Sequence, residues 1–212
     1  MNRRDFTMQT GGAALGLALA GPVAAQAPVE GTHYVKLSQP VPVGTLPAGK
    51  KVEVLEFFWY ECPHCNQFEP LLEAWVRKLP ADVEFRRVPV GFTARHQVAQ
   101  KVYYALEELG LLPTLHRKVF TAIHGQGQRM TSEADAVAIV TGAGADKAKF
   151  VEAYKSFQVS TKAAKAKQLS DAYKIDGVPA LGIHGRYFTS GSLAGSHERA
   201  LAVADYLIQR SR

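Results

Sequence analysis

The chain has only two cysteines among its 212 residues, Cys62 and Cys65, and two residues separate them. There is no second C-x-x-C and no histidine pair at zinc-ligand spacing, so one chain cannot supply the four ligands of a structural zinc site. A zinc ion shared between chains stays a minor alternative. A disulfide between these cysteines would close almost no loop and would add little stability through chain entropy. The pair therefore indicates reactivity.

Apolar runs long enough to span a membrane are also missing. The weakly apolar stretch at residues 11–23 is too short for a membrane helix. It follows Arg3 and Arg4 and precedes the small residues VAAQA, the pattern of a secretory signal peptide, and we expect residues 1–25 to be removed after Ala25. Because NRRDFTM also resembles a twin-arginine signal, export by the twin-arginine route and by the Sec route are both predicted alternatives.

A strong excess of one charge sign is absent as well. The net charge of +6 falls to +5 when Arg3, Arg4 and Asp5 leave with the signal peptide. The lysines between residues 147 and 167 are spread at helical spacing among alanines and acids, without the aromatic platforms of nucleic-acid grooves. The glycine-containing segments HGQGQ and TGAGAD match no dinucleotide or phosphate loop. We therefore expect a solvated helix face and no nucleic-acid partner.

Residues 50–60 are apolar on both alternating faces, which predicts a central strand that is covered on both sides. A helix is expected directly after this strand. Pro63 suits its first turn, and apolar residues recur at three- and four-residue spacing from Cys65 to Leu79. Residues 82–90 predict a second strand, so the chain begins its fold as strand, helix, strand.

Helical spacing dominates the middle of the chain, between about residues 94 and 173. The last helix of this stretch is expected from about Ser160 to Tyr173. Other expected elements are an edge strand at 33–37, two short strands within 177–189 and a closing helix over 196–209. The predicted order is β-β-α-β, a helical insert, then α-β-β-α.

The start of the helix gives Cys62 its expected chemistry. Unpaired backbone N–H groups and a partial positive charge at a helix N-terminus stabilise an anion, which lowers the pKa of a thiol there. Cys65 lies one turn further on and faces the core. We expect one exposed and one shielded sulfur, so that a mixed disulfide at Cys62 is resolved by Cys65 or by a second substrate thiol. His64 adds a donor or a positive charge near the sulfur, or else it is only a solvated histidine.

The segment LEFFWYECPHCNQFEP, followed far downstream by GVPALGIHGRY, resembles the DsbA family of periplasmic thiol oxidases. The resemblance covers essentially the whole exported chain. It implies an α/β fold in which a thioredoxin-like domain, residues 26–91 and 159–212, is interrupted by an inserted all-helical domain, residues 92–158. It also implies a periplasmic location and no metal or organic cofactor, since the redox group is the disulfide Cys62–Cys65.

The same resemblance assigns roles to the motif residues. Cys62 would be the sulfur that a substrate thiolate attacks, and Cys65 would be its buried partner. Pro63 and His64 would be the dipeptide that tunes the pair.

Three further positions match the family outside the motif. Pro179 matches the cis-proline, which would aim the backbone of Val178 at a bound peptide for strand-like pairing. Glu56 matches the family's buried acid. Burial would raise its pKa and suit a proton carrier for Cys65, whereas a solvent-facing role is the alternative. Arg87 stands where the family often has a lysine, and a guanidinium cannot exchange protons.

These assignments predict a thiol:disulfide oxidoreductase that donates the Cys62–Cys65 disulfide to unfolded or newly exported proteins with free thiols. The family implies a DsbB-type, quinone-linked membrane reoxidase, and we expect a monomer. An isomerase or reductase is an alternative, but residues 26–49 are too few for the N-terminal dimerisation domain usual in DsbC-type isomerases. A redox-silent, peptide-binding chaperone on the same scaffold is the alternative from another class.

Overall fold

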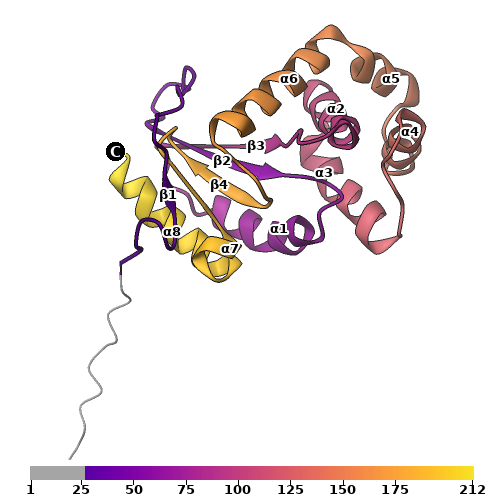
Figure 1. The fold of residues 1–212 in the computed structure, drawn as a ribbon. Helices are drawn as coiled ribbons and strands as arrows, with labels where there is room; N and C mark the ends of the chain where they lie inside the picture. Colours follow the sequence, from indigo (N-terminus) through magenta and orange to yellow (C-terminus); the bar gives the residue numbers. More distant parts are fainter. Residues whose placement is uncertain (1–26) are drawn as a thin grey trace, which may run out of the picture.

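The computed structural model describes residues 27–212, so the predicted signal peptide, residues 1–25, lies outside the described residues. Within them, five strands form one sheet in the order β1-β5-β4-β2-β3 (Figure 1). The pair β2 and β3 is parallel, while β2–β4, β4–β5 and β1–β5 are antiparallel. The strands are β1 (Val35–Lys36), β2 (Val52–Phe58), β3 (Val83–Pro89), β4 (Ala180–Ile183) and β5 (Tyr187–Ser190).

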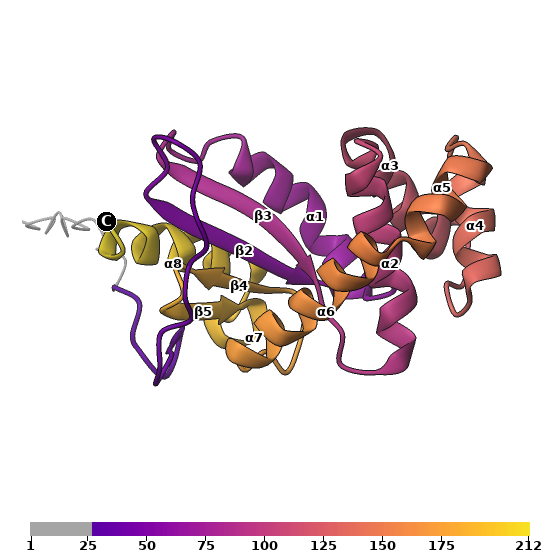
Figure 2. The same ribbon diagram turned by 90° about the horizontal axis from the view of Figure 1, so that it is seen from above.

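Helices cover the sheet and also stand beyond one of its ends. They are α1 (Pro63–Val76), α2 (Ala94–Glu108), α3 (Leu112–Phe120), the π-helical turn η1 (Thr121–Gly125), α4 (Glu133–Gly142), α5 (Lys147–Lys155), α6 (Phe157–Ala172), α7 (Gly191–Ala194) and α8 (His197–Arg210). Figures 1 and 2 both place α2 to α5 beyond the ends where β2 and β3 finish. None of the helices in residues 27–212 is long and apolar enough to cross a membrane.

Strand β2 is the centre of the fold because both of its faces are buried. All seven of its residues are buried, as the pattern of residues 50–60 predicted. Val52 and Val54 belong to a core with residues of α1 and α8, whereas Leu55 and Phe57 belong to a second core with residues of α2 and α6. With both faces covered, the end of β2 is the part of the strand that can carry a site.

The observed order of elements confirms the predicted order, with α7 as an addition between β5 and the last helix. The edge strand β1 is shorter than residues 33–37. Helix α6 begins at Phe157 rather than at Ser160, because the Ser156 hydroxyl caps it by accepting from the N–H of Val159 at 3.0 Å. Helices α2 to α5 lie within residues 92–158, and the exact domain bounds, 26–91 with 159–212 and 92–158, stay a prediction.

Candidate active site

Cys62 lies where the turn after β2 enters helix α1. It is the N-cap of α1, and Pro63 is the first helical residue, as the sequence predicted. The Cys62 Sγ accepts a hydrogen bond from the backbone N–H of Cys65 at 3.4 Å. Sulfur thus takes the place that a serine or aspartate oxygen fills at many helix starts. Both cysteines are reduced in the structure, which therefore represents the dithiol form.

The two sulfurs differ in exposure less than we expected. Cys65 is fully buried, but Cys62 also keeps only 8% of its surface exposed, so the prediction of a freely exposed sulfur is wrong in degree. The loop before β4 explains the difference, because the Cys62 thiol donates to the carbonyl of Val178 at 3.4 Å and lies under that loop. Cys65 has no exposed surface, so Cys62 is the sulfur of the pair that faces solvent.

The surroundings of Cys62 lower its pKa to about 6. The largest cause is a hydrogen bond from the Cys65 side chain. Burial opposes it, and the backbone N–H groups of Cys65 and His64 together with the charge of His64 add to the lowering. His64 itself is exposed. The predicted thiolate at the helix start is thus supported by the geometry, with His64 as a smaller contributor than the N-cap contacts.

Cys65 experiences the opposite effect. Burial raises its pKa well above the usual value, and the hydrogen bond to Cys62, the charge of Cys62 and the charge of Glu56 raise it further. At neutral pH the pair therefore holds one thiolate, on Cys62, and one protonated thiol, on Cys65. Any reaction that releases Cys65 as a thiolate must bring a proton to it.

Val178 and Pro179 lie against the sulfur of Cys62. The peptide bond between them is cis, which confirms the prediction made from the GVP motif. Pro179 is buried at the start of β4, and Val178 is half-buried with its carbonyl towards Cys62. A peptide bound at Cys62 would therefore lie next to this backbone segment.

A cluster of charged side chains is buried beneath the motif. Glu56 is fully buried, which confirms that expectation, and Arg87 Nε lies 2.9 Å from its Oε2. Arg87 also forms an ion pair with Glu69 of α1, and His116 Nε2 of α3 lies 3.5 Å from Glu69 Oε1. The cluster thus joins β2, β3, α1 and α3 behind Cys65.

The two acids of this cluster titrate in opposite directions. Burial raises the pKa of Glu56 to about 8; the negative charge of Glu69 adds to this effect and Arg87 opposes it. Burial also acts to raise the pKa of Glu69, but the hydrogen bond from His116 and the charge of Arg87 lower it overall. At neutral pH Glu56 is therefore mostly protonated, while Glu69 is ionised.

Sequence reasoning missed Glu69 and His116. Glu69 carried a usable signal, because it lies four residues after Cys65 and three before Leu72, on the buried stripe of the helix. His116 carried none, since the contact of α3 with α1 depends on how the helices beyond the sheet pack.

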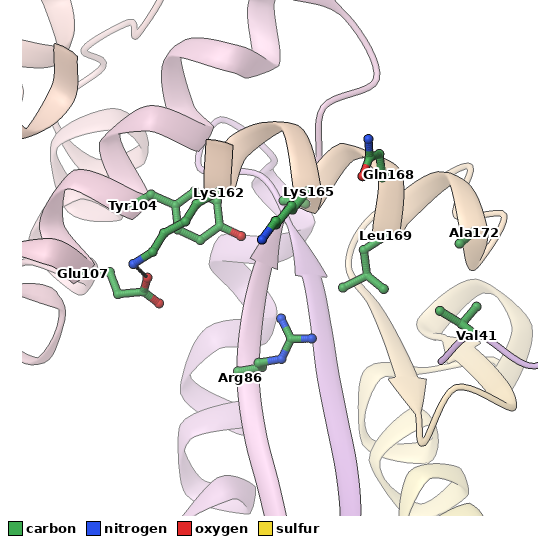
Figure 3. A pocket seen from close by; sticks show the side chains of 10 residues that line it. Val41, Arg86, Tyr104, Glu107, Lys162, Lys165, Gln168, Leu169 and Ala172 are labelled. Atoms are coloured by element: carbon green, nitrogen blue, oxygen red, sulfur yellow. Dashed lines mark hydrogen bonds and ion pairs between the residues drawn. The ribbon is translucent and has the colours of Figure 1, made fainter. Parts of the chain in front are cut away.

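A separate groove of about 490 Å³ lies between α2, α6 and β3, and Figure 3 shows its lining. Lys162 and Glu107 form an ion pair at 2.7 Å on one wall, and Arg86, Lys165 and Leu169 face the same space. It contains neither cysteine nor the cis-proline, so it is not part of the candidate active site. Residues 27–212 contain no group of three or more histidine, cysteine or carboxylate side chains placed to hold a metal ion.

The comparisons with known proteins agree with this geometry. A family model described as a DSBA-like thioredoxin domain matches residues 53–198. The thiol:disulfide interchange protein DsbA of Azotobacter vinelandii is 45% identical over 183 residues, which cover 86% of this chain and 84% of that protein. The DsbA of Bordetella pertussis is 42% identical over the full length of both chains. The crystal structure of Pseudomonas aeruginosa DsbA matches with a TM-score of 0.80 at 41% identity, over 86% of this chain and 93% of that one. These matches confirm the predicted thioredoxin-like fold with a helical insertion.

The thiol pKa values predict which cysteine reacts first. In the reduced protein, iodoacetamide should label Cys62 with a rate that rises with pH around a midpoint near 6, because the thiolate is the nucleophile. Cys65 should stay unlabelled through pH 8. Peptide mass spectrometry after timed quenching measures both rates, and the urea-unfolded chain, in which both thiols titrate near about 8.5, is the control. Preferential labelling of Cys65 would refute the assignment.

Proposed function

Because this chain belongs to the family of DSBA-like thioredoxin domains, we propose that it donates the disulfide between Cys62 and Cys65 to exported proteins that carry free thiols. It is a thiol:disulfide oxidoreductase. The observation that most strongly supports the donor direction is the N-cap position of Cys62. A stabilised thiolate favours the reduced pair, so the disulfide tends to pass to the substrate.

The transfer takes two exchange steps. A substrate thiolate attacks Cys62 Sγ, the Cys62–Cys65 bond breaks, and its electron pair goes to Cys65 Sγ, which takes up a proton. A second thiolate of the substrate then attacks the substrate sulfur of the mixed disulfide, and Cys62 leaves as a thiolate. The low pKa of Cys62 makes it a good leaving group in this second step. The substrate gains one disulfide and the enzyme gains two electrons.

Glu56 supplies the proton that Cys65 needs in the first step. With a pKa of about 8 its carboxyl is mostly protonated at neutral pH, and its ionised form raises the pKa of Cys65, so the protonation states of the two groups are linked. After the transfer, Arg87 at 2.9 Å stabilises the carboxylate, although the guanidinium does not exchange protons itself. Glu56 then regains a proton from solvent before the next cycle.

The substrate peptide lies along Val178 and Pro179. Their backbone faces Cys62, and a strand-like peptide can pair with it through main-chain hydrogen bonds, which suits many different sequences. A hollow of about 380 Å³, lined in part by His64, Ser192 and His197, adjoins the motif and gives room for side chains that flank the substrate cysteine.

The remaining assignments follow from the family and from the N-terminal sequence. We infer that the protein acts in the periplasm as a monomer after export by the Sec or the twin-arginine route. A DsbB-type, quinone-linked membrane protein reoxidises the pair, and no metal or organic cofactor takes part. The thioredoxin-like domain comprises residues 26–91 and 159–212, and the helical insert comprises residues 92–158.

Single-turnover oxidation of a reduced, unfolded two-cysteine protein tests the donor function. Each oxidised enzyme should form one substrate disulfide while its own pair becomes reduced, as counted by acid quenching and thiol alkylation. The Cys62→Ser variant is the control and should form none. An isomerase would instead rearrange scrambled disulfides faster than it oxidises dithiols. A chaperone would suppress aggregation equally well after both thiols are alkylated. Faster rearrangement than oxidation, or undiminished suppression of aggregation by the alkylated protein without substrate oxidation by the unmodified one, would contradict the proposal.

Replacing Glu56 by glutamine should slow the enzyme and stabilise it at the same time. Without the acid, release of Cys65 should slow by about ten-fold or more. General acid–base catalysis contributes at least about 10²-fold, and we expect a smaller loss here because water can protonate Cys65 in place of Glu56. The folded pKa of Glu56, about 8, lies above the unfolded value of about 4.3. The protonated carboxyl of Glu56 therefore contributes its full stability below about pH 4.3, and this contribution is lost as the pH rises towards 8. Glutamine cannot ionise and keeps that stability, so Glu56→Gln should be more stable than the wild type at pH 7 by about 1–3 kcal/mol.

Stopped-flow exchange and urea unfolding between pH 5 and 8 measure both effects. Glu53→Gln is the matched control, since Glu53 is a second buried acid of β2 that pairs with Arg86 at 2.9 Å and does not touch the cluster. It should leave the exchange rate unchanged. Equal exchange rates in Glu56→Gln and the wild type would remove Glu56 from the mechanism.

A further inference from the structure

Tyr60, two residues before Cys62, is held at both of its polar ends by histidines from the helices beyond the sheet. Its hydroxyl lies 2.8 Å from Nδ1 of His116 in α3, and its carbonyl oxygen lies 2.7 Å from Nε2 of His124 in η1. Tyr60 is fully buried, and its ring packs against Phe120, which lies between the two histidines in sequence. Nothing in the exchange chemistry described above uses these contacts.

The directions of these hydrogen bonds follow from the neighbouring groups. Burial raises the pKa of Tyr60 well above its usual value, so the hydroxyl keeps its proton and donates it to Nδ1 of His116. That leaves the proton of the neutral His116 ring on Nε2, which faces the ionised Glu69. The carbonyl of Tyr60 can only accept, so Nε2–H of His124 donates to it. The tautomer of His116 is therefore fixed by its two partners, and Nε2 of His124 is the donor to Tyr60.

The π-helical turn is what brings His124 onto the same side as His116. In a regular α-helix, residues eight apart are about 80° out of phase, whereas seven residues make nearly two full turns of about 3.6 each. In η1 the N–H of Gln126 donates to the carbonyl of Thr121, five residues back, so this turn holds one extra residue. The extra residue lets His124 point where the seventh residue would otherwise point, towards Tyr60.

The next residue, Glu61, is attached to the same helices. Its carboxylate pairs with Arg95 of α2 at 3.1 Å and accepts from the backbone N–H of Met130 at 3.4 Å. The turn closes when the N–H of Cys62 donates to the carbonyl of Trp59 at 3.0 Å. The segment that delivers Cys62 to the helix start is thus fastened at Tyr60 and Glu61 to residues outside the sheet.

We propose that His116 and His124 are positioning residues that lock the Trp59–Cys62 turn through Tyr60, and so hold the Cys62 sulfur against the N–H of Cys65. Neither histidine touches a thiol, and both act through Tyr60. The proposal rests on the proposed function in that Cys62 is the reacting sulfur, but it is tested on the reduced protein without any substrate.

His124→Leu removes the donor to Tyr60, and His124→Gln keeps an N–H donor there. In His124→Leu the pKa of Cys62, followed by the ultraviolet absorbance of the thiolate, should rise by about 0.5–1 unit, the effect of weakening one hydrogen bond to a charged acceptor. The equilibrium constant for reduction of the pair by glutathione at pH 7 should fall about three- to five-fold. His124→Gln should restore both values to near those of the wild type.

Val140→Ala separates positioning from loss of stability. Val140 is fully buried in α4 and forms no hydrogen bond to residues 59–62, so its truncation should lower the melting temperature and leave the pKa of Cys62 unchanged. Tyr60→Phe tests the His116 contact, since it removes only the hydroxyl, and it should raise the pKa in the same direction. The proposal is overturned if His124→Leu matches Val140→Ala in leaving Cys62 unaffected, or if His124→Gln behaves like His124→Leu. If His124→Leu fails to fold, Tyr60→Phe decides the question. An unchanged pKa of Cys62 in Tyr60→Phe would then overturn the proposal.

Discussion

The contact of Cys65 with the sulfur of Cys62, made by the Cys65 side chain and by its backbone N–H at 3.4 Å, is the interaction on which the chemistry of the site depends. It exists because a helix start leaves N–H groups without partners, and a sulfur anion accepts from them better than a neutral thiol does. Strand β2, buried on both faces, and Pro63, in the first turn, fix where that helix start lies. A thiolate stabilised there favours the dithiol form, so this helix start shifts the pair towards donating its disulfide.

The environment of Cys65 opposes ionisation, whereas that of Cys62 favours it. In the buried cluster behind Cys65 the two acids also differ, since the pKa of Glu56 is raised and that of Glu69 is lowered. Glu69 stays ionised because Arg87 and His116 surround it, and its charge helps to keep the proton on Glu56. Four titratable side chains in one core are costly unless they are paired, and here the pairing leaves a single group, Glu56, ready to change its protonation state.

Local patterns predicted the parts that depend on local sequence. Alternation over residues 50–60 gave β2, and the C-P-H-C spacing placed Cys62 at the start of α1. The cis bond before Pro179 came only from the family resemblance, since about 5–6% of X–Pro bonds in folded proteins are cis. The burial of Cys62 was missed because the covering loop lies more than a hundred residues away in sequence. The contacts of His124 were out of reach as well, because a π-helical turn interrupts the helical period on which such predictions rely.

The unfolding free energies of the reduced and oxidised proteins between pH 5 and 8 test the account most directly. The folded pKa of Cys62, about 6, lies below the unfolded value of about 8.5, so its contribution is complete above 8.5 and is lost as the pH falls through 6. At pH 7 this contributes about 1.4 kcal/mol to the reduced form, close to the roughly 2 kcal/mol that closing a four-residue loop gives the oxidised form. The pH dependence is therefore the decisive quantity. From pH 5 to pH 8 the reduced form should gain about 2.5 kcal/mol over the oxidised form, and a difference that stays constant across this range would contradict the account.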